Sequence, residues 1–195
     1  MNNDKYQIIA IMGKSGSGKD TLCKALLEQP EFSNTVPIIS CTTRPIRDYE
    51  KNGVDYHYLT VEEFQNRVLN EDMIEATVFN NWCYGTAFSN LDKNKINIGV
   101  FNPEGVEQLK DHPNIKLTLL YVEADDKVRL LRSLNREDNP DCHEIVRRFT
   151  TDEKDFCDEE IEFLNPDLHI INNGKASIEQ LAQTIAGLWW KGQIR

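Results

Sequence analysis

The sequence predicts an α/β fold built on a central parallel sheet. Residues 6–12 (YQIIAIM) form a short, nearly continuous apolar run, which is typical of a strand buried on both faces. A glycine- and serine-rich stretch over 13–18 follows this run, and residues 20–28 then show helical spacing. Because strand and helix patterns go on alternating along the chain, we expect parallel strands joined by crossover helices.

The later elements follow in chain order from the same kinds of local pattern. Thr60 and Glu63 form an S/T-x-x-E capping box, which predicts the start of a helix. The polar region 42–60 lacks a long periodic segment and indicates an inserted subdomain, and the polar residues 133–143 contain a proline and indicate a mobile loop. We expect further strands at 37–41, 72–80, 96–101, 116–122 and 168–171, and further helices at 61–70, 125–134, 144–163 and 177–190.

Length and composition restrict the class of protein. The 195 residues suit one domain, and 22 Lys and Arg against 32 Asp and Glu give a net charge of −10. A protein this acidic is not expected to bind nucleic acid or an anionic membrane, although a local positive field can still bind small anions. Five cysteines without a C-x-x-C pair argue against a zinc site and a disulfide framework. With no apolar stretch of about 20 residues and no signal peptide, we expect a cytoplasmic monomer or homodimer with small-molecule partners.

The stretch 13–19 matches the pattern G-x-x-x-x-G-K of a phosphate-binding loop, or P-loop. In such a loop successive backbone N–H groups hold the β-phosphate of a nucleotide, and side chains larger than glycine would block its approach. Lys19 then reaches the β- and γ-phosphates of ATP as a point charge. The residues expected to bind the donor nucleotide are Gly13, Ser15, Gly16, Ser17, Gly18, Lys19, Asp20 and Thr21.

The residue after this lysine departs from the usual pattern. Serine or threonine, whose hydroxyl ligates Mg²⁺, is usual here, whereas this chain has Asp20. A carboxylate is also a hard oxygen ligand and suits the N-terminus of a helix electrostatically. Without a metal it would repel the phosphates. We therefore expect Asp20 to support the metal and to make nucleotide binding unusually dependent on Mg²⁺.

A second motif gives a resemblance to a known family. Residues 40–47 (SCTTRPIR) are followed by Glu50, Gly53, Asp55 and Tyr56. This resembles the guanylate kinase family, whose members carry S-x-T-T-R-x-x-R-x-x-E-x-x-G-x-D-Y, and the resemblance extends through the whole chain as far as residue 172. The residues that it places on the phosphate of an acceptor nucleotide are Arg44, Arg47, Tyr56 and Tyr84. Two arginines three apart and a phenol can surround one phosphate with charge-assisted hydrogen bonds.

The resemblance also implies a site for the base of the acceptor. In the family an acidic residue ten before the glycine of a Y-G-[ST] motif reads guanine, and Glu75 stands ten before Gly85. Guanine N1–H and N2–H₂ offer two donors side by side, which one carboxylate accepts together, whereas adenine offers no such pair. The resemblance assigns Ser40 and Thr86 to the same edge of the base.

The end of the third strand departs from the family. Guanylate kinases carry D-x-D there, to support Mg²⁺-bound water and to help fix the guanosine, and this chain has Val100 and Asn102. Val100 cannot support the metal, while the carbonyl of Asn102 can partly replace the second aspartate. A carboxylate lost at Val100 and gained at Asp20 suggests an exchange of metal support. These two departures also resemble a relative, ribose 1,5-bisphosphate phosphokinase.

Arginines around the polar loop match the family's lid. Arg132 and Arg136 are four apart, as in the family's R-x-x-x-R, and Arg148 keeps the family's spacing of three after an isoleucine. We therefore favour Arg148 over its neighbour Arg147. Arginines that close over a transferring phosphoryl group stabilise its charge, and a lid excludes water. Asn172 matches the family's asparagine near the adenine, but a loop cap is an equally good interpretation.

These features predict a P-loop NTPase three-layer fold with a central parallel sheet, an acceptor-binding insertion and a lid. We divide the guanylate kinase-like domain, 1–195, into a core (1–37, 93–131 and 149–195), the insertion (38–92) and the lid (132–148). The resemblance implies ATP- and Mg²⁺-dependent phosphorylation of GMP or dGMP. The residues expected to be catalytic are Lys19, Arg44, Arg132, Arg136 and Arg148. The alternatives are a kinase for another nucleoside monophosphate or for ribose 1,5-bisphosphate, and a non-catalytic binding module, although such modules typically lose the loop and the lid arginines.

Overall fold

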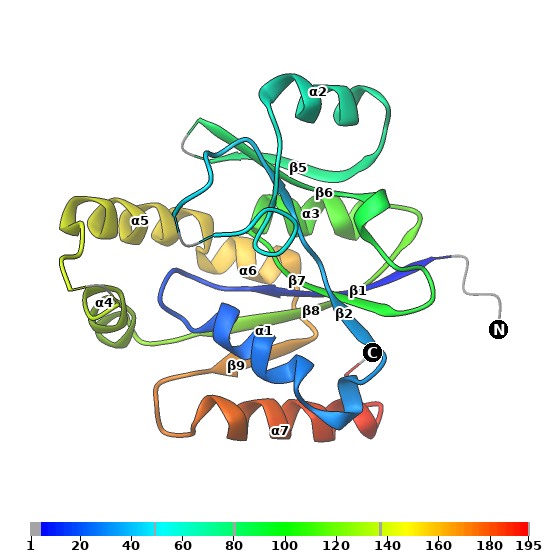
Figure 1. The fold of residues 1–195 in the computed structure, drawn as a ribbon. Helices are drawn as coiled ribbons and strands as arrows, with labels where there is room; N and C mark the ends of the chain where they lie inside the picture. The colour runs from blue at the N-terminus through cyan, green and yellow to red at the C-terminus, as the bar shows by residue number, and fades with distance from the viewer. Residues whose placement is uncertain (1–4, 49, 80, 137, 195) are drawn as a thin grey trace.

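The computed structural model describes residues 5–48, 50–79, 81–136 and 138–194, and Figure 1 shows their arrangement. The strands are β1 (Tyr6–Met12), β2 (Thr35–Pro37), β3 (Cys41–Thr42), β4 (His57–Tyr58), β5 (Met73–Phe79), β6 (Trp82–Ala87), β7 (Ile96–Val100), β8 (Ile115–Glu123) and β9 (Leu168–Ile171). The helices are α1 (Lys19–Leu27), α2 (Val61–Leu69), α3 (Pro103–Asp111), α4 (Asp126–Leu134), α5 (Cys142–Asp155), α6 (Asp158–Leu164) and α7 (Ile178–Trp190), with 3₁₀ turns at Pro30–Phe32 and Phe88–Asn90.

The central sheet has five strands in the order β2-β7-β1-β8-β9, and every neighbouring pair is parallel. β1 lies in the middle, and residues 8–12 are buried on both of its faces. The parallel sheet and its doubly buried first strand confirm the predicted α/β fold. Because the strands are parallel, their carboxyl ends share one edge of the sheet, and the turn after β1 lies at this edge beside α4 and α5 (Figure 1).

Helices cover both faces of the central sheet, which gives the three layers that the sequence predicts (Figure 1). Successive side chains of a strand point to opposite faces, so β1 contributes to two cores. Ile9 and Ile11 pack with residues of α1 and α7 on one face. Ile8 and Met12 pack with residues of α3 and α6 on the other.

A second sheet, of order β4-β3-β6-β5, lies above the central sheet in Figure 1, with α2 on its outer side. β3 pairs with β4 in parallel and with β6 in the antiparallel sense, and β5 and β6 are also antiparallel. α2 begins with the predicted capping box, in which the Thr60 hydroxyl accepts the Glu63 N–H and the Glu63 carboxylate accepts the Thr60 N–H. The four strands and α2 all fall within 38–92, the range expected for the insertion.

Two predicted elements have the wrong bounds. The strand expected at 37–41 is interrupted, because the chain crosses from β2 in the central sheet to β3 in the second sheet between Pro37 and Cys41. The helix expected at 144–163 is divided into α5 and α6. Phe156 leaves the helical conformation (φ −122°, ψ 41°) and is buried with its ring stacked on Tyr121 at 6.1 Å between centroids. Burial of this aromatic ring ends α5.

The local patterns do not predict β6 or α3. β6 (WCYGTA) lacks a clear alternation of apolar and polar residues, and it forms by pairing with β3 and β5 on its two sides. α3 has nine residues that include a proline and a glycine, and Asn102 caps it by accepting the Gly105 N–H at 2.9 Å. Both elements depend on tertiary contacts more than on propensity.

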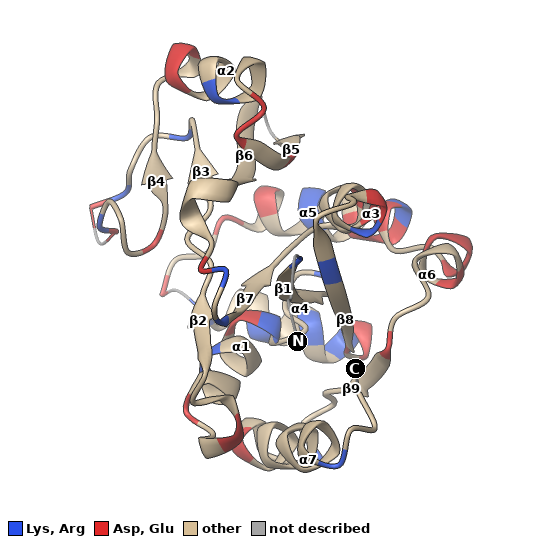
Figure 2. Ribbon diagram, turned by 90° about the vertical axis from the view of Figure 1, so that its right-hand side faces the viewer, with Lys and Arg blue, Asp and Glu red and all other residues tan. Residues whose placement is uncertain are grey.

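Charge is spread unevenly over the structure. Figure 2 shows Asp and Glu on α6 and on the first turn of α2, Lys and Arg on α4, and residues of both signs on α5. All five cysteines are free thiols in the structure. Within the described ranges, no helix combines the length and the hydrophobicity needed to cross a membrane, and no cluster of three or more His, Cys, Asp or Glu side chains could hold a metal ion.

Candidate functional site

The stretch 13–18, which we call the glycine turn, connects β1 to α1 at the carboxyl edge of the central sheet. Gly18 is the N-cap of α1 in the left-handed conformation (φ 91°, ψ 13°), and its position is not capped by a side-chain hydrogen bond. The first N–H groups of a helix have no intrahelical partner and carry the positive end of its dipole. A Cβ atom at Gly16 would lie 2.6 Å from the backbone oxygen of Arg129, so only glycine fits there. This geometry is a cradle for an anion.

Side chains add a positive charge and an unpaired hydroxyl to the cradle. The Lys19 side chain is 20% exposed, and its Nζ lies 3.7 Å from the carboxylate of Asp20. Asp20 and Thr21 are exposed on the first turn of α1. The Ser17 hydroxyl is buried and has no hydrogen-bond partner among the described residues. A buried polar group without a partner is costly, so this hydroxyl fits a ligand that brings acceptor oxygens, such as a phosphate.

Arg132 and Asn172 both contact the glycine turn. Arg132 Nη1 donates to the backbone oxygens of Gly16 and Ser17 at 3.3 and 3.2 Å, and its Nη2 donates to Asn172 Oδ1 at 3.3 Å. Asn172 is buried just after β9, and its Nδ2 donates to the Ser17 oxygen at 2.7 Å. Asn172 therefore acts as a cap of the turn here, and its predicted contact with adenine stays a prediction.

The other lid arginines lie on α5 and in the turn after α4. Arg147 Nε and Nη2 donate to the two carboxylate oxygens of Glu144 at 2.7 and 2.9 Å, and Arg148 Nε donates to one of them at 2.7 Å. These hydrogen bonds lower the pKa of Glu144 to about 2. Arg147 also lies over the ring of Phe79 on β5 at 5.1 Å, whereas Arg136 is exposed after α4. Because Arg147 is turned toward β5, Arg148 remains the residue that we favour for the phosphoryl group.

Arg44 lies at the centre of a charged and aromatic group on the second sheet, which we call the Arg44 cluster. Its Nη1 and Nη2 donate to the carboxylate of Glu50 at 3.0 and 2.7 Å, and the Tyr58 hydroxyl donates to the same carboxylate at 2.7 Å. The guanidinium lies 5.6 Å from the ring centroid of Tyr56, which packs edge-on against Tyr84 at 6.0 Å. Hydrogen bonding from Arg44 lowers the pKa of Glu50 to about 2, so the ion pair is charged at neutral pH.

Backbone pairing explains where this cluster lies. The Thr43 N–H donates to the Cys83 oxygen at 3.0 Å, and the Thr43 hydroxyl accepts the Cys83 N–H at 2.9 Å. The Thr42 hydroxyl donates to the same oxygen at 3.0 Å and accepts the Arg44 N–H at 3.1 Å. The two threonines thus join β3 to β6 and place Arg44 beside the tyrosines, while Arg47 lies exposed further along the loop.

Glu75 is a buried carboxylate on β5, with an exposed fraction of 6%. It stands opposite Thr86 in the β5–β6 ladder and is hydrogen-bonded to it, and the Thr86 hydroxyl lies 3.4 Å from that of Ser40. Burial, with a smaller contribution from Glu104, raises the pKa of Glu75 to about 7, because a desolvated carboxyl disfavours its charged form. A Cβ atom at Gly85 would lie 2.6 Å from the backbone oxygen of Glu75, so this site also requires glycine.

The end of β7 supplies an amide in place of carboxylates. Val100 is half-buried and brings no polar side-chain group, and Asn102 Nδ2 donates to the Thr77 hydroxyl at 3.4 Å. A Cβ atom at Gly105 would lie 2.9 Å from Asn102 Oδ1 and 3.1 Å from Glu75 Oε2, so these two polar side chains are neighbours. The described residues therefore present N–H groups at the glycine turn and a buried acceptor at Glu75. In the Arg44 cluster, the donors of Arg44 and Tyr58 are bonded to Glu50 in this structure.

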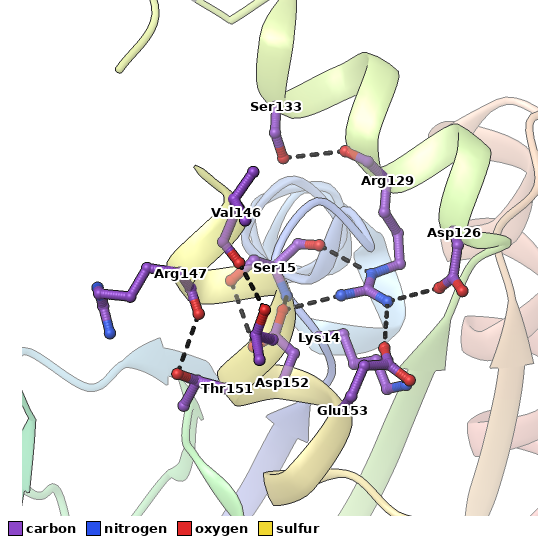
Figure 3. Close-up of polar contacts among 11 residues, drawn as sticks. Lys14, Ser15, Asp126, Arg129, Ser133, Val146, Arg147, Thr151, Asp152 and Glu153 are labelled. Carbon is purple, nitrogen blue, oxygen red and sulfur yellow. Dashed lines mark hydrogen bonds and ion pairs between the residues drawn. The ribbon is translucent and has the colours of Figure 1, made fainter. Parts of the chain in front are cut away.

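The sequence analysis missed a buried ionic group behind the glycine turn, which Figure 3 shows. Arg129 of α4 is only 1% exposed and hydrogen-bonds both Ser15 in the turn and Asp152 of α5. Helical spacing could have indicated these two residues. Arg129 stands three residues before Arg132, and Asp152 stands four after Arg148, so each lies on the same helix face as a predicted lid arginine. Glu50 belongs to the motif that resembles the guanylate kinase family, but no pattern in the sequence indicates that it pairs with Arg44.

Comparisons with known proteins place the chain in a family. A family model described as guanylate kinase matches residues 5–186. The guanylate kinase of Wigglesworthia glossinidia brevipalpis is 36% identical over 157 residues, which are 77% of this chain and 74% of that protein. That of Clostridium perfringens (strain SM101 / Type A) is 45% identical over 92 residues, 47% of this chain and 41% of that protein, so the match spans about two fifths of the relative's length.

A solved structure supports the fold independently. The crystal structure of guanylate kinase from Anaplasma phagocytophilum aligns with a TM-score of 0.64 at 22% sequence identity, over 98% of this chain and 88% of that chain. At that identity the likeness speaks for the P-loop NTPase fold alone. The family model, in contrast, extends over nearly the whole sequence and includes both the glycine turn and the second sheet. The chain belongs to the guanylate kinase family.

Proposed function

We propose that the protein transfers the γ-phosphoryl group of ATP to GMP or dGMP. The observation that carries this proposal is the buried carboxylate of Glu75, with the hydroxyls of Ser40 and Thr86 beside it, on the same sheet as the Arg44 cluster. Guanine brings two adjacent N–H donors to such a carboxylate, and the phosphate of the same nucleotide suits arginines and tyrosines. The residues proposed to bind the acceptor are Ser40, Arg44, Arg47, Tyr56, Glu75, Tyr84, Gly85, Thr86 and Asn102.

The donor nucleotide is assigned to the glycine turn. Its N–H groups and Lys19 hold the β- and γ-phosphates of ATP. The lid arginines surround the phosphoryl group as it is transferred and exclude water; they are Arg132, Arg136 and Arg148. No covalent intermediate is required, because the residues hold two anions in line and neutralise them. The residues proposed to bind ATP are Gly13, Ser15, Gly16, Ser17, Gly18, Lys19, Asp20, Thr21 and Asn172. We further propose a cytoplasmic monomer or homodimer, in keeping with the free thiols.

A coupled assay of ATP consumption over a panel of acceptors tests this function. The panel comprises GMP, dGMP, IMP, AMP, dTMP and ribose 1,5-bisphosphate, and we expect turnover with GMP and dGMP above all others. The end of β7 has Val100 where guanylate kinases carry a carboxylate that supports the metal. This departure favours ribose 1,5-bisphosphate as the second candidate acceptor. Turnover of that sugar alone would support the second candidate. Absence of turnover with every acceptor would support a binding module.

Asp20 is the residue that we propose to support Mg²⁺. The ion usually keeps several waters and takes one or two carboxylates together with substrate phosphates, so a single exposed carboxylate on the first turn of α1 fits it. Bound Mg²⁺ neutralises charge on the donor phosphates. Burial raises the pKa of Tyr56, and the charges of Tyr84 and Asp20 add to this effect, so Asp20 is near enough to Tyr56 to interact with it electrostatically.

For Asp20→Ser we expect a smaller gain in ATP affinity on adding Mg²⁺ than for the wild type, by roughly fivefold. That factor corresponds to about 1 kcal/mol, the interaction of two unit charges about 4 Å apart in water. The serine variant lacks the carboxylate that repels phosphates in the absence of metal and attracts the metal in its presence. Titrations of ATP with Mg²⁺ and with a chelator measure the difference. An equal Mg²⁺ dependence in both proteins contradicts the role of Asp20.

The raised pKa of Glu75 predicts that GMP binding depends on pH. Only the ionised carboxyl accepts two donors, so with a pKa of about 7 we expect GMP to bind about tenfold more weakly at pH 6 than at pH 8. The pH dependence of folding stability has the opposite sign to that of GMP binding. The pKa rises from its ordinary 4.5 on folding, so the free protein loses stability as pH rises through the range from 4.5 to about 7.

Calorimetric titration of GMP between pH 6 and pH 8 checks this expectation. The matched control is Glu75→Gln, because the phosphate of GMP titrates in the same range with both proteins, whereas the glutamine does not ionise. The control should therefore show a flatter profile. Parallel profiles for the two proteins would show that Glu75 does not carry the pH dependence.

A further inference from the structure

Arg129 of α4 and Asp152 of α5, which we call the loop clamp, contact the glycine turn at Ser15, on the side that faces α4 and α5 (Figure 3). Arg129 Nε donates to the backbone oxygen of Ser15 at 3.0 Å, and Nη2 donates to the Asp152 carboxylate at 2.9 Å. Asp152 in turn accepts the Ser15 N–H at 2.7 Å. Both backbone polar groups of one residue in the turn are therefore bonded to the clamp.

The surroundings of Arg129 complete its hydrogen bonding. Nη1 donates to Asp126 at 2.8 Å and to Glu153 at 3.2 Å, and the guanidinium lies 4.7 Å from the ring centroid of Phe149. Glu153 also accepts a hydrogen bond from Lys14 Nζ at 2.7 Å. All three nitrogens of the guanidinium group thus have partners. Charged hydrogen bonds tie the turn to both helices.

Stability alone does not account for such a group. A buried ion pair loses about as much by desolvation as it gains by attraction, so an apolar pair of similar volume would stabilise the fold equally well. An ion pair differs from an apolar pair in that it fixes the direction of its partners, here the Ser15 peptide. A glycine-rich turn has many conformations open to it, and a turn already fixed in one of them avoids that entropic cost when a ligand binds.

We propose that Arg129 and Asp152 are positioning residues for the phosphates of the donor nucleotide. They hold both backbone groups of Ser15 from outside the turn and so fix the path of the chain toward α1, whose first N–H groups have no partner within the helix. This inference rests on the proposed use of the glycine turn as the ATP site. It requires nothing of the acceptor site.

The same clamp also places two of the three proposed lid arginines, Arg132 and Arg148. Arg129 is one helical turn before Arg132 on α4, and Asp152 is one helical turn after Arg148 on α5, so each clamp residue shares a helix face with an arginine. Arg132 already contacts the oxygens of Gly16 and Ser17. The clamp therefore keeps both helices against the glycine turn.

The test is a double variant, Arg129→Met with Asp152→Ala, which removes both charges together. We expect its melting temperature to stay near that of the wild type, because no unpaired charge is left buried. The Kd for ATP with Mg²⁺, measured by direct titration, should rise roughly 10- to 100-fold, the cost of misplaced binding groups. The KM for ATP should rise with it while the KM for GMP stays unchanged. The matched control, Arg67→Met with Asp72→Ala, removes an ion pair between α2 and the turn before β5 and should leave the Kd for ATP unchanged.

A double variant with wild-type melting temperature and wild-type ATP affinity overturns the proposal. If the double variant does not fold, Asp152→Asn replaces it, because asparagine keeps the size and an acceptor oxygen for the Ser15 N–H but loses the charge that holds Arg129. A rise in its Kd for ATP supports the proposal, and an unchanged Kd overturns it. The titration needs no acceptor, so a wild-type protein that binds ATP without phosphorylating GMP contradicts the proposed function and leaves the clamp testable.

Discussion

Replacing Lys19 by alanine is expected to lower kcat by roughly 10²- to 10³-fold, the usual cost of removing one preorganised group from a developing charge. Lys19 is the first residue of α1, directly after the glycine turn, where its ammonium group can contact the β- and γ-phosphates. Lys14, the other lysine near the turn in sequence, does not replace it, because it is bonded to Glu153 of α5. Initial rates at saturating ATP and GMP measure the loss.

Lys24→Ala is the matched control for this prediction. Lys24 lies on the same helix, is exposed, and carries the same charge in the last turn of α1. We expect it to keep the wild-type kcat, which would show that the effect at position 19 is local rather than a change in overall charge. A Lys19→Ala protein with near wild-type turnover would falsify the assignment of the glycine turn to the donor phosphates.

Replacing Glu75 by glutamine is expected to lower the preference for GMP over AMP by roughly 10²-fold in kcat/KM. The glutamine amide keeps one acceptor oxygen but turns an NH₂ group toward one of the two donors of guanine. Each mispaired donor in a desolvated site costs about 1–3 kcal/mol. The ratio of kcat/KM values for the two nucleotides, measured side by side, gives the change in selectivity.

Glu104→Gln is the control for Glu75→Gln. Glu104 lies in the first turn of α3, where its charge contributes to the raised pKa of Glu75, but it is exposed. We expect this variant to keep its selectivity for GMP. Unchanged GMP-over-AMP selectivity in Glu75→Gln, in a protein that melts like the wild type, would show that another group reads the base.

Elements whose information is local could be predicted from the sequence. The apolar run of β1, the glycines that follow it and the helical spacing of α1 lie within about 20 residues of each other, and the structure confirms all three. The capping box at Thr60 and Glu63 is a contact between residues three apart, so its sequence pattern already specifies its geometry. The T-T-R motif likewise pointed to Arg44, whose contact with a phosphate stays a prediction, and its two threonines act by joining β3 to β6.

Elements that depend on distant partners could not be predicted. β6 forms because β3 and β5 flank it, and the break between α5 and α6 occurs where Phe156 meets Tyr121 of β8. The charge state of Glu75 is of the same kind. A lone glutamate in a strand pattern reads as exposed, and only its burial on β5 raises its pKa to about 7.

The sequence by itself determined the family, the glycine turn and the residue types that suit phosphate and guanine, because these are carried by short motifs with fixed spacing. The tertiary structure alone decided how the turn is held. Ser15 and Asp152 are separated by 137 residues and yet form a hydrogen bond of 2.7 Å, with Arg129 buried between them. A motif records which residues follow one another, whereas a buried ion pair needs partners that only the packing of α4 and α5 against the turn brings together.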